Sequence, residues 1–250
     1  MDNNIPDWKG RTALATTDNY AAGVIAGGYL KTVLKDGDTL GILDPFMTQD
    51  IFRRLCAETD IELEFHGHDD LGLATANTLA AVRGGATHAS VCVLGLGERA
   101  GNAALEEVVT ALGETQGRRT AVSLSRLDGL ATMVAEAAGR PIPESKSIVG
   151  GSVFAHESGI HVSGILRDVG TYEALDPKRF GRERQIVLGK HSGRAAIRSM
   201  LHSVGLESDH QRISEILSAV RARAVSGKRA VSIAELMDMH ALTLPTEKYA

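Results

Sequence analysis

Hydrophobic positions alternate between short apolar runs and helical spacing in the part of the chain that follows its first 37 residues. Thr39–Leu43 is a short apolar run of the kind that forms a buried strand. In Thr48–Glu58 the apolar residues recur at intervals that place them on one face of a helix. We therefore expect a strand followed by an amphipathic helix.

The same order occurs twice more before residue 115. Ile61–His68 predicts a second strand, and Leu71–Arg83 predicts an Ala-rich helix closed by two glycines that suit a C-cap. Thr87–Leu94 predicts a third strand, which is followed by a Gly-rich turn and a helix from Ala103 to Leu112. Three such units predict parallel α/β architecture, as in a barrel or a doubly wound sheet. They do not close a barrel, which takes about 250 residues by itself.

The second half of the chain has a different character. Leu124–Gly139 predicts an amphipathic helix, and Pro141 and Pro143 mark a break after it. Ser147–Arg194 is rich in Gly, His and Ser with little periodicity, which is typical of loops that carry function. Three more helices are predicted at Arg194–Val204, Gln211–Val225 and Ile233–Ala241. The expected organisation is an atypical segment at 1–37, a β/α part at 38–115 and a mostly helical region at 116–250.

Two histidines stand at the end of the second predicted strand. Strand residues two positions apart share a face and lie about 6.6 Å apart, so His66 and His68 can converge on one metal ion. Catalytic groups of α/β barrels come from the same strand ends. The alternative is a pair of hydrogen-bonded polar residues inside a barrel. The residues of this strand expected to face the helices are Ile61, Leu63 and Phe65.

The Gly-rich turn after the third strand ends at Asn102, which has two interpretations. It is a natural N-cap for a helix that begins at Ala103, and Glu106 and Glu107 would favour the positive end of that helix. Alternatively, its side-chain oxygen completes a cation site beside the two histidines. Imidazole and oxygen ligands suit Mg, Mn, Zn or Fe.

Two later motifs also contain residues that carry chemistry. His156 lies in a Gly-rich, weakly periodic segment, which is compatible with a structural histidine or with a mobile lid that carries an acid or base. Leu188–Gly193 precedes a predicted helix and is compatible with a turn and helix cap or with anion binding.

Charge and composition narrow the function classes. The formal net charge of -4 argues against broad binding to nucleic acid or to an anionic membrane. The two cysteines, Cys56 and Cys92, form no CxxC motif, so neither a disulfide framework nor a thiolate zinc site is expected. No apolar run approaches the roughly 20 residues that span a bilayer, and the first residues lack the features of a secretory signal. A cytoplasmic protein is therefore expected.

Taken together, these motifs resemble the homocitrate synthase, isopropylmalate synthase and citramalate synthase family, from about Asp38 to at least Gly193. The resemblance implies that 38–115 is the C-terminal part of a TIM-barrel catalytic domain, with its last three β/α units, and that 116–250 is a lid and dimerisation region. The motifs that carry it are DTLGILDP, EFHGHDDLGLATAN, GLGERAGNAALEE, FAHESGIHVSGIL, TYEALDP and LGKHSG.

The resemblance also implies roles for single residues. His66, His68 and Asn102 would be ligands of a divalent metal, Mg, Mn or Zn, and Thr39 would help to hold the carboxylate of a 2-oxo acid. The family's reaction joins acetyl-CoA to a 2-oxo acid after a base removes a proton from the acetyl methyl group. The metal makes the keto group electrophilic.

The same resemblance points to residues that act after the barrel and between subunits. His156 and Tyr172 match a post-barrel histidine and tyrosine that reach into the active site of a neighbouring subunit, so they are the expected catalytic residues of a homodimer. Within the family, homocitrate synthase of the nitrogen-fixation type is the preferred interpretation. Val162 stands where isopropylmalate synthases usually have Gln, and the chain ends soon after Gly193, before a leucine-sensing domain. Fragments of isopropylmalate or citramalate synthase are the alternatives.

The chain also departs from the family pattern. Leu94 stands where the family usually has Asn, and residues 1–37 contain no Arg-Asp-Gly-Glu-Gln run, which supplies an Arg and the remaining metal ligand on the first strand. We therefore expect either a separate N-terminal subunit or an inactive remnant, including a regulatory dimerisation subunit. A lyase that cleaves hydroxymethylglutaryl-CoA is a weaker alternative, because such enzymes have a Cys-containing loop in place of GLGERAGN and lack the post-barrel region.

Overall fold

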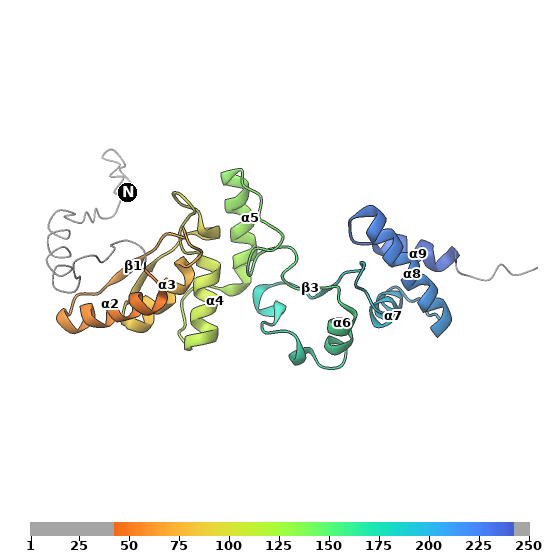
Figure 1. Ribbon diagram of the computed structural model, residues 1–250, viewed down its shortest axis with the longest axis horizontal. Coiled ribbons are helices and arrows are strands. Elements are labelled where there is room, and N and C mark those ends of the chain that lie inside the picture. The colour runs from red at the N-terminus through yellow and green to blue at the C-terminus, as the bar shows by residue number, and fades with distance from the viewer. Residues whose placement is uncertain (1–42, 243–250) are drawn as a thin grey trace, which may run out of the picture. The chain divides into compact units, whose positions relative to one another are not determined.

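The computed structural model describes residues 43–242. The chain divides into two compact units, Met1–Leu43 and Asp44–Ala250, and every element described below belongs to the second (Figure 1). The strand predicted at Thr39–Leu43 lies outside the described residues except for Leu43, which belongs to no helix or strand.

Two helices pack against each other at the start of this unit (Figure 1). Helix α2 (Pro45–Glu58) begins after Asp44, whose carboxylate accepts a hydrogen bond from the Met47 amide, which would otherwise lack a partner in the first turn. Helix α3 (Ala74–Gly84) is followed by Gly85 at the C-cap. Its φ of 122° is a conformation that glycine adopts readily, and its N–H donates to carbonyl groups of the last turn. The C-cap predicted from the two glycines is thus confirmed.

Strands β1 (Glu64–His66) and β2 (His88–Ser90) are paired in parallel, as the predicted strand–helix repeat requires. Phe65 is buried, as predicted, but Ile61 is 72% exposed because the chain has not yet entered the strand there. The prediction that Ile61 faces the helices is therefore wrong. Two short parallel strands establish a mixed α/β structure in the described part of the chain, but they do not by themselves confirm a partial barrel.

The following segment contains a short 3-10 turn and two α-helices. The 3-10 turn η1 (Val93–Gly95) replaces the end of the third predicted strand, and helix α4 (Leu105–Gln116) begins two residues later than expected. The helix predicted at Leu124–Gly139 consists of a 3-10 turn, η2 (Leu124–Arg126), and helix α5 (Leu127–Ala138). Both proline positions that follow lie outside helices, as predicted.

The remainder of the unit is mainly helical. Strands β3 and β4 are two residues long and parallel, with His156 opposite Ile186. None of the described helices is both long and apolar enough to cross a membrane. The elements are β3 (Ala155–His156), α6 (Gly159–Ile165), η3 (Val169–Thr171), η4 (Pro177–Phe180), β4 (Gln185–Ile186), α7 (Arg194–Ser203), α8 (His210–Gly227) and α9 (Ile233–Leu242).

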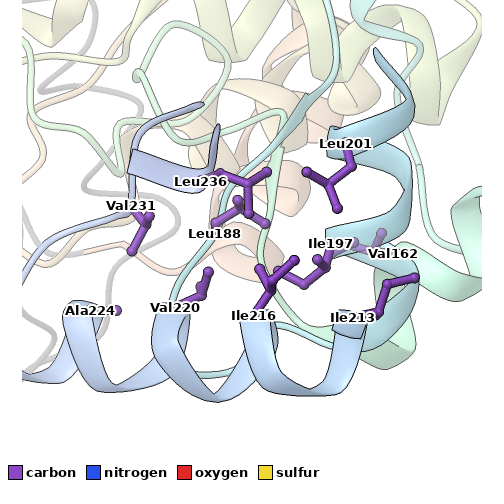
Figure 2. Packing of buried hydrophobic residues seen from close by; sticks show 11 residues of the cluster. Val162, Leu188, Ile197, Leu201, Ile213, Ile216, Val220, Ala224, Val231 and Leu236 are labelled. Carbon is purple, nitrogen blue, oxygen red and sulfur yellow. The ribbon is translucent and has the colours of Figure 1, made fainter. Parts of the chain in front are cut away.

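Buried apolar residues gather in several clusters, two of which support the segment around His156. One cluster joins α4 and α5 to the residues just before β3, and it includes Val109, Leu127, Ala131, Val149, Phe154 and Phe180. The other joins α6 to the three C-terminal helices, and Figure 2 shows its side chains pointing toward one another. Its members include Val162, Leu188, Ile197, Leu201, Ile213, Ile216, Val220, Val231 and Leu236. His156 lies in the chain between segments that belong to the two clusters.

Candidate active site

The two histidines predicted to bind metal lie side by side at the end of β1. Their Nε2 atoms are 3.4 Å apart, and their ring planes are perpendicular. Two nitrogen ligands that each lie about 2.1 Å from one ion would be separated by roughly 3.0 to 3.4 Å at octahedral or tetrahedral angles. The spacing of His66 and His68 therefore fits a shared divalent ion.

Asn102 is placed beside these histidines, and it does not cap a helix. It forms an antiparallel bridge with His68, whereas the N-cap position of α4 is Ala104, which has no capping side chain. The N-cap interpretation of Asn102 is thus wrong, because the helix begins only at Leu105.

The amide of Asn102 is held in one orientation. Its Nδ2 donates to the carbonyl of Leu96 and to Sγ of Cys92, each at 3.2 Å, so Oδ1 is the atom left over. Both Asn102 Oδ1 and Nδ1 of His68 are buried, and neither has a hydrogen-bond partner among residues 43–242. A buried polar atom without a partner costs about 1–3 kcal/mol. A cation at Asn102 Oδ1 would remove that cost, so the orphaned oxygen fits the role of a ligand.

These three side chains supply only part of a metal site. Within residues 43–242, no group of three or more His, Cys, Asp or Glu side chains is arranged to hold a metal ion. Two imidazoles and one amide oxygen suit a borderline or hard divalent cation such as Zn, Mn or Mg. A cation here would need further ligands in addition to His66, His68 and Asn102.

The loops that carry these ligands are tied together by an ion pair and by a close backbone approach. Arg99 donates to both carboxylate oxygens of Asp70 at 2.9–3.0 Å, and this contact holds the pKa of Asp70 below its usual range. A Cβ atom at Gly97 would overlap the side-chain amide of Asn102. Glycine at this position therefore lets the loop fold over the amide.

The buried carboxylate of Glu106 is hydrogen-bonded to the backbone just before the same loop. Leu94 has a left-handed φ of 58°, and its amide donates to Oε2 of Glu106 at 3.0 Å. Lys146 lies 3.4 Å from Glu106 Oε1 and 2.5 Å from Glu107 Oε1. Burial lowers the pKa of Lys146, but the hydrogen bond and charge of Glu107 and the charge of Glu106 outweigh burial and raise it overall. Lys146, which follows the two prolines, thus neutralises Glu106, the acid bonded to the loop, and the adjacent Glu107.

A cavity of about 350 Å³ opens next to Asn102. Its walls are formed by the Gly-rich loop, by Asp69 and Thr75, and by the segment from Arg140 to Lys146. This volume lies in the range of small-molecule sites. His66 and His68 do not line it.

His156 belongs to a second polar cluster. Its Nε2 lies 3.2 Å from Oε1 of Glu173, and Arg184 binds both oxygens of that carboxylate, with Nη2 to Oε2 at 2.6 Å. The side chain of Glu173 is only 4% exposed. The hydrogen bond from Arg184, and after it the charge of Arg184 and contact with His156, hold the pKa of Glu173 below its usual range despite burial.

Tyr172 is 41% exposed, and its ring lies against that of His161 with centroids 4.7 Å apart. In the part of the chain that the structure describes, no hydrogen bond or ring contact joins Tyr172 to His156. Likewise, no described contact joins either residue to the pair formed by His66 and His68. Within residues 43–242, the predicted site residues therefore do not form a single cluster.

Thr39, expected to hold a substrate carboxylate, lies outside the described residues. Glu173 and Arg184 were not singled out from the sequence, although Glu173 directly follows Tyr172 in the motif TYEALDP. An acidic residue directly after a predicted catalytic residue is the sequence signal that would have indicated Glu173.

Two family models match the chain. A model described as HMGL-like matches residues 12–134, and a model described as homocitrate synthase post-HMGL domain-like matches residues 148–228. The first match begins inside the segment 1–37, for which the motifs gave no family counterpart.

Named relatives include three kinds of synthase. The chain is 48% identical to 2-isopropylmalate synthase 2 of Caldanaerobacter subterraneus, over 81% of this chain and 53% of that protein. It is 51% identical to homocitrate synthase of Frankia alni, over 70% of this chain and 50% of the relative. It is 43% identical to the protein named putative (R)-citramalate synthase CimA in Methanosarcina mazei, over 80% of this chain and 44% of the relative.

The chain thus spans about half the length of these relatives. It combines an HMGL-like segment with a post-HMGL segment of homocitrate synthase type, in the order in which the motifs occur. Its two domains and its homologues support membership of the family of 2-isopropylmalate, homocitrate and citramalate synthases.

Proposed function

We propose that this chain takes part in an acyltransferase reaction of the Claisen type, in which acetyl-CoA, a 2-oxo acid and water give free CoA and a 2-hydroxy acid with one more carboxylate than the 2-oxo acid. The observation that carries the proposal is the bridge between His68 and Asn102, whose buried Oδ1 has no hydrogen-bond partner among the described residues, together with the 3.4 Å separation of the Nε2 atoms of His66 and His68. The three residues that the motifs predicted as ligands thus offer ligand atoms on one side of two adjoining loops.

In this proposal His66, His68 and Asn102 hold a divalent cation, Mg, Mn or Zn. A cation bound there would polarise the keto group of the 2-oxo acid. The bonds from Asn102 Nδ2 to Leu96 and Cys92 fix the orientation of the amide and leave its oxygen for the proposed cation. Thr39 remains a predicted contact to the substrate carboxylate.

His156 is the proposed group that accepts a proton from the acetyl methyl group, because a histidine is ionisable near neutral pH. Tyr172 has an exposed side chain whose hydroxyl group can donate a hydrogen bond to the thioester oxygen as that oxygen gains charge. We further propose that these residues act in the site of a second copy of the chain, as the family resemblance implies.

Homocitrate formation from 2-oxoglutarate is the proposed specificity. The post-HMGL match of homocitrate synthase type and the homocitrate synthase relative support it, while the 2-isopropylmalate and citramalate synthase relatives make 2-oxoisovalerate and pyruvate the alternative acceptors. We retain the proposed organisation with a barrel-derived part at 38–115 and a lid and dimerisation region at 116–250. A separate N-terminal subunit would supply the remaining barrel strands.

The test measures release of the CoA thiol by the purified chain in the presence of Mg or Mn, with each of the three 2-oxo acids in turn. A second series adds the N-terminal half of the homocitrate synthase from Frankia alni. Release that depends on 2-oxoglutarate in either series, and that is lost in His68→Ala but retained in His88→Ala, is the expected result. His88 is the control because it is an exposed histidine on the adjacent strand.

Three other outcomes have distinct meanings. Release with 2-oxoisovalerate or pyruvate would retain the reaction and change the substrate. Equal activity of His68→Ala and the unchanged chain would contradict the proposed role of His68 as a metal ligand. Absence of release with every acceptor in both series would overturn the catalytic proposal in favour of an inactive remnant or a regulatory subunit.

A further inference from the structure

The backbone around Asn102 is bonded both to the segment that carries His68 and to the segment that carries Cys92. Asn102 forms an antiparallel bridge with His68. The amide of Ala103 donates to the carbonyl of Gly67 at 3.3 Å, and its carbonyl accepts from the amide of Cys92 at 3.0 Å. The side chain of Cys92 therefore starts from a backbone position that is fixed relative to Asn102.

The side-chain amide of Asn102 has two acceptors for its two hydrogens. Nδ2 donates to the carbonyl of Leu96 and to Sγ of Cys92, each at 3.2 Å. An amide held by one acceptor can still turn about the bond to its Cβ, whereas acceptors on two segments fix its plane. Because the carbonyl of Leu96 can only accept, the nitrogen must face it, and Oδ1 is the buried atom left without a partner among the described residues.

The thiol of Cys92 is not placed as a metal ligand beside the histidines. Within the described ranges, no group of three His, Cys, Asp or Glu side chains is arranged to hold a metal ion, so Cys92 does not complete one with His66 and His68. The cysteine is free of any disulfide, and its sulfur lies against the amide nitrogen of Asn102. Its contact is therefore with a proposed ligand and not with the ligand position.

We propose that Cys92 is a positioning residue, whose sulfur accepts the second hydrogen of Asn102 Nδ2 and so holds Oδ1 ready for the cation. This inference rests on the proposed function of Asn102. A serine hydroxyl at position 92 also offers an acceptor, whereas valine, which has nearly the same shape as cysteine, offers none. Removal of such a supporting contact typically weakens metal binding by about 10- to 100-fold.

Packing of the partly buried thiol is the competing explanation, and two variants separate it from the proposal. Cys92→Val keeps the bulk of the side chain and removes the acceptor. Cys92→Ser keeps an acceptor and removes bulk. If the sulfur only fills space, serine is the more harmful substitution; if it accepts the amide, valine is. Cys56→Val, at the free cysteine of α2, is the matched control.

The first measurement is the dissociation constant for Mn²⁺, from electron paramagnetic resonance of the free ion, with the melting temperature of each variant beside it. Cys92→Val is expected to raise this constant by about tenfold or more, and Cys92→Ser to keep it within about threefold. Cys56→Val is expected to bind as the unchanged chain does. A loss of affinity in Cys92→Ser that equals or exceeds the loss in Cys92→Val would overturn the proposal.

A second measurement asks whether the sulfur itself binds the metal. The chain loaded with Co²⁺ is expected to lack the near-ultraviolet absorption that a thiolate bound to cobalt produces. Such an absorption in the unchanged chain, lost in Cys92→Ser, would make Cys92 a ligand and overturn its positioning role.

A third measurement needs no metal. The two side-chain amide hydrogens of Asn102, assigned by NMR with Asn102→Asp, are expected to exchange slowly with water in the unchanged chain and in Cys92→Ser. Exchange is expected to be about tenfold faster in Cys92→Val, which has lost one acceptor. Equal exchange in all three proteins would overturn the proposal. If the unchanged chain binds no Mn²⁺ but the exchange rates are as expected, the proposed metal site fails while the orientation of Asn102 by Cys92 is confirmed.

Discussion

Lys146 Nζ lies 3.4 Å from Oε1 of Glu106, and the Glu106 side chain is buried. The other oxygen of that carboxylate accepts a hydrogen bond from the amide of Leu94, which lies in the turn η1 just before the Gly-rich loop that ends at Asn102. The contact therefore links the segment after the proline break to the loop with the proposed ligand. A substitution of Lys146 should alter the position of the loop that carries Asn102, although in the described part of the chain no hydrogen bond or ion pair joins the two side chains.

We expect Lys146→Met to lower the free energy of unfolding by about 3 kcal/mol, because it leaves a buried carboxylate without its cation. Chemical denaturation measures this loss. Adding Glu106→Gln to Lys146→Met should recover at least half of the loss, since the remaining amide carries no charge. An equal loss in the single and double variants would mean that the charge of Glu106 is not what Lys146 balances.

Removal of a histidine from the proposed metal site should weaken cation binding without unfolding the chain. We expect His66→Ala and His68→Ala each to raise the dissociation constant for Mn²⁺ by at least about tenfold, measured by electron paramagnetic resonance of the free ion. His88→Ala should bind Mn²⁺ as the unchanged chain does. Binding that is unaffected by any of the three substitutions would place the cation elsewhere.

Two glycines in helices allow a matched comparison. In α5, nothing lies within 4 Å of a Cβ added at Gly129, so Gly129→Ala should stabilise the chain by about 0.5–1 kcal/mol through helix propensity. In α6, a Cβ added at Gly164 would overlap the ring of Tyr172, so Gly164→Ala should destabilise it by about 1 kcal/mol and shift the Tyr172 ring from His161. Thermal unfolding and the NMR signals of the Tyr172 ring measure the two effects. Stabilisation by both substitutions would show that the Tyr172 ring does not depend on Gly164.

Acid should weaken the fold partly through Glu173. Its pKa in the folded chain is below the usual value of 4.5, so near and below that pH the unfolded chain binds more protons than the folded chain. The stabilisation by Glu173 is therefore fully present well above pH 4.5 and is lost as the pH falls toward the lowered pKa. Urea unfolding between pH 7 and pH 3 should show a smaller loss of stability in Glu173→Gln with Arg184→Met than in the unchanged chain. Identical pH dependence in both would contradict the ion pair.

Helices and their ends could largely be predicted because their signals are local. The apolar spacing in 211–225 predicted α8, and glycine after α3 predicted a C-cap with a backbone conformation that side chains disfavour. The strands could be located but not bounded. Apolar alternation continues through Ile61, yet β1 begins only at Glu64, where β2 is available for pairing.

The candidate site shows a similar division. The spacing of His66 and His68 was sufficient to predict that their rings meet, because they are two residues apart near a strand end. The orientation of the Asn102 amide depends on its bonds to Cys92 and Leu96, which no local pattern encodes. The contact of Glu173 with His156 and Arg184 depends on the long-range pairing of β3 with β4. Strands of two residues are too short to leave a periodic signal in the sequence.

The shared core of α6 and α9 has a genetic consequence. Val162, six residues after His156, and Leu236, in α9, are both fully buried in the same apolar cluster (Figure 2). A stop codon between Lys228 and Leu236 would delete no residue of the candidate active site, yet it would remove one wall of that core. Such an allele should impair the segment around His156 as severely as a missense change within it, so mapped mutations in α9 belong with those of the candidate active site.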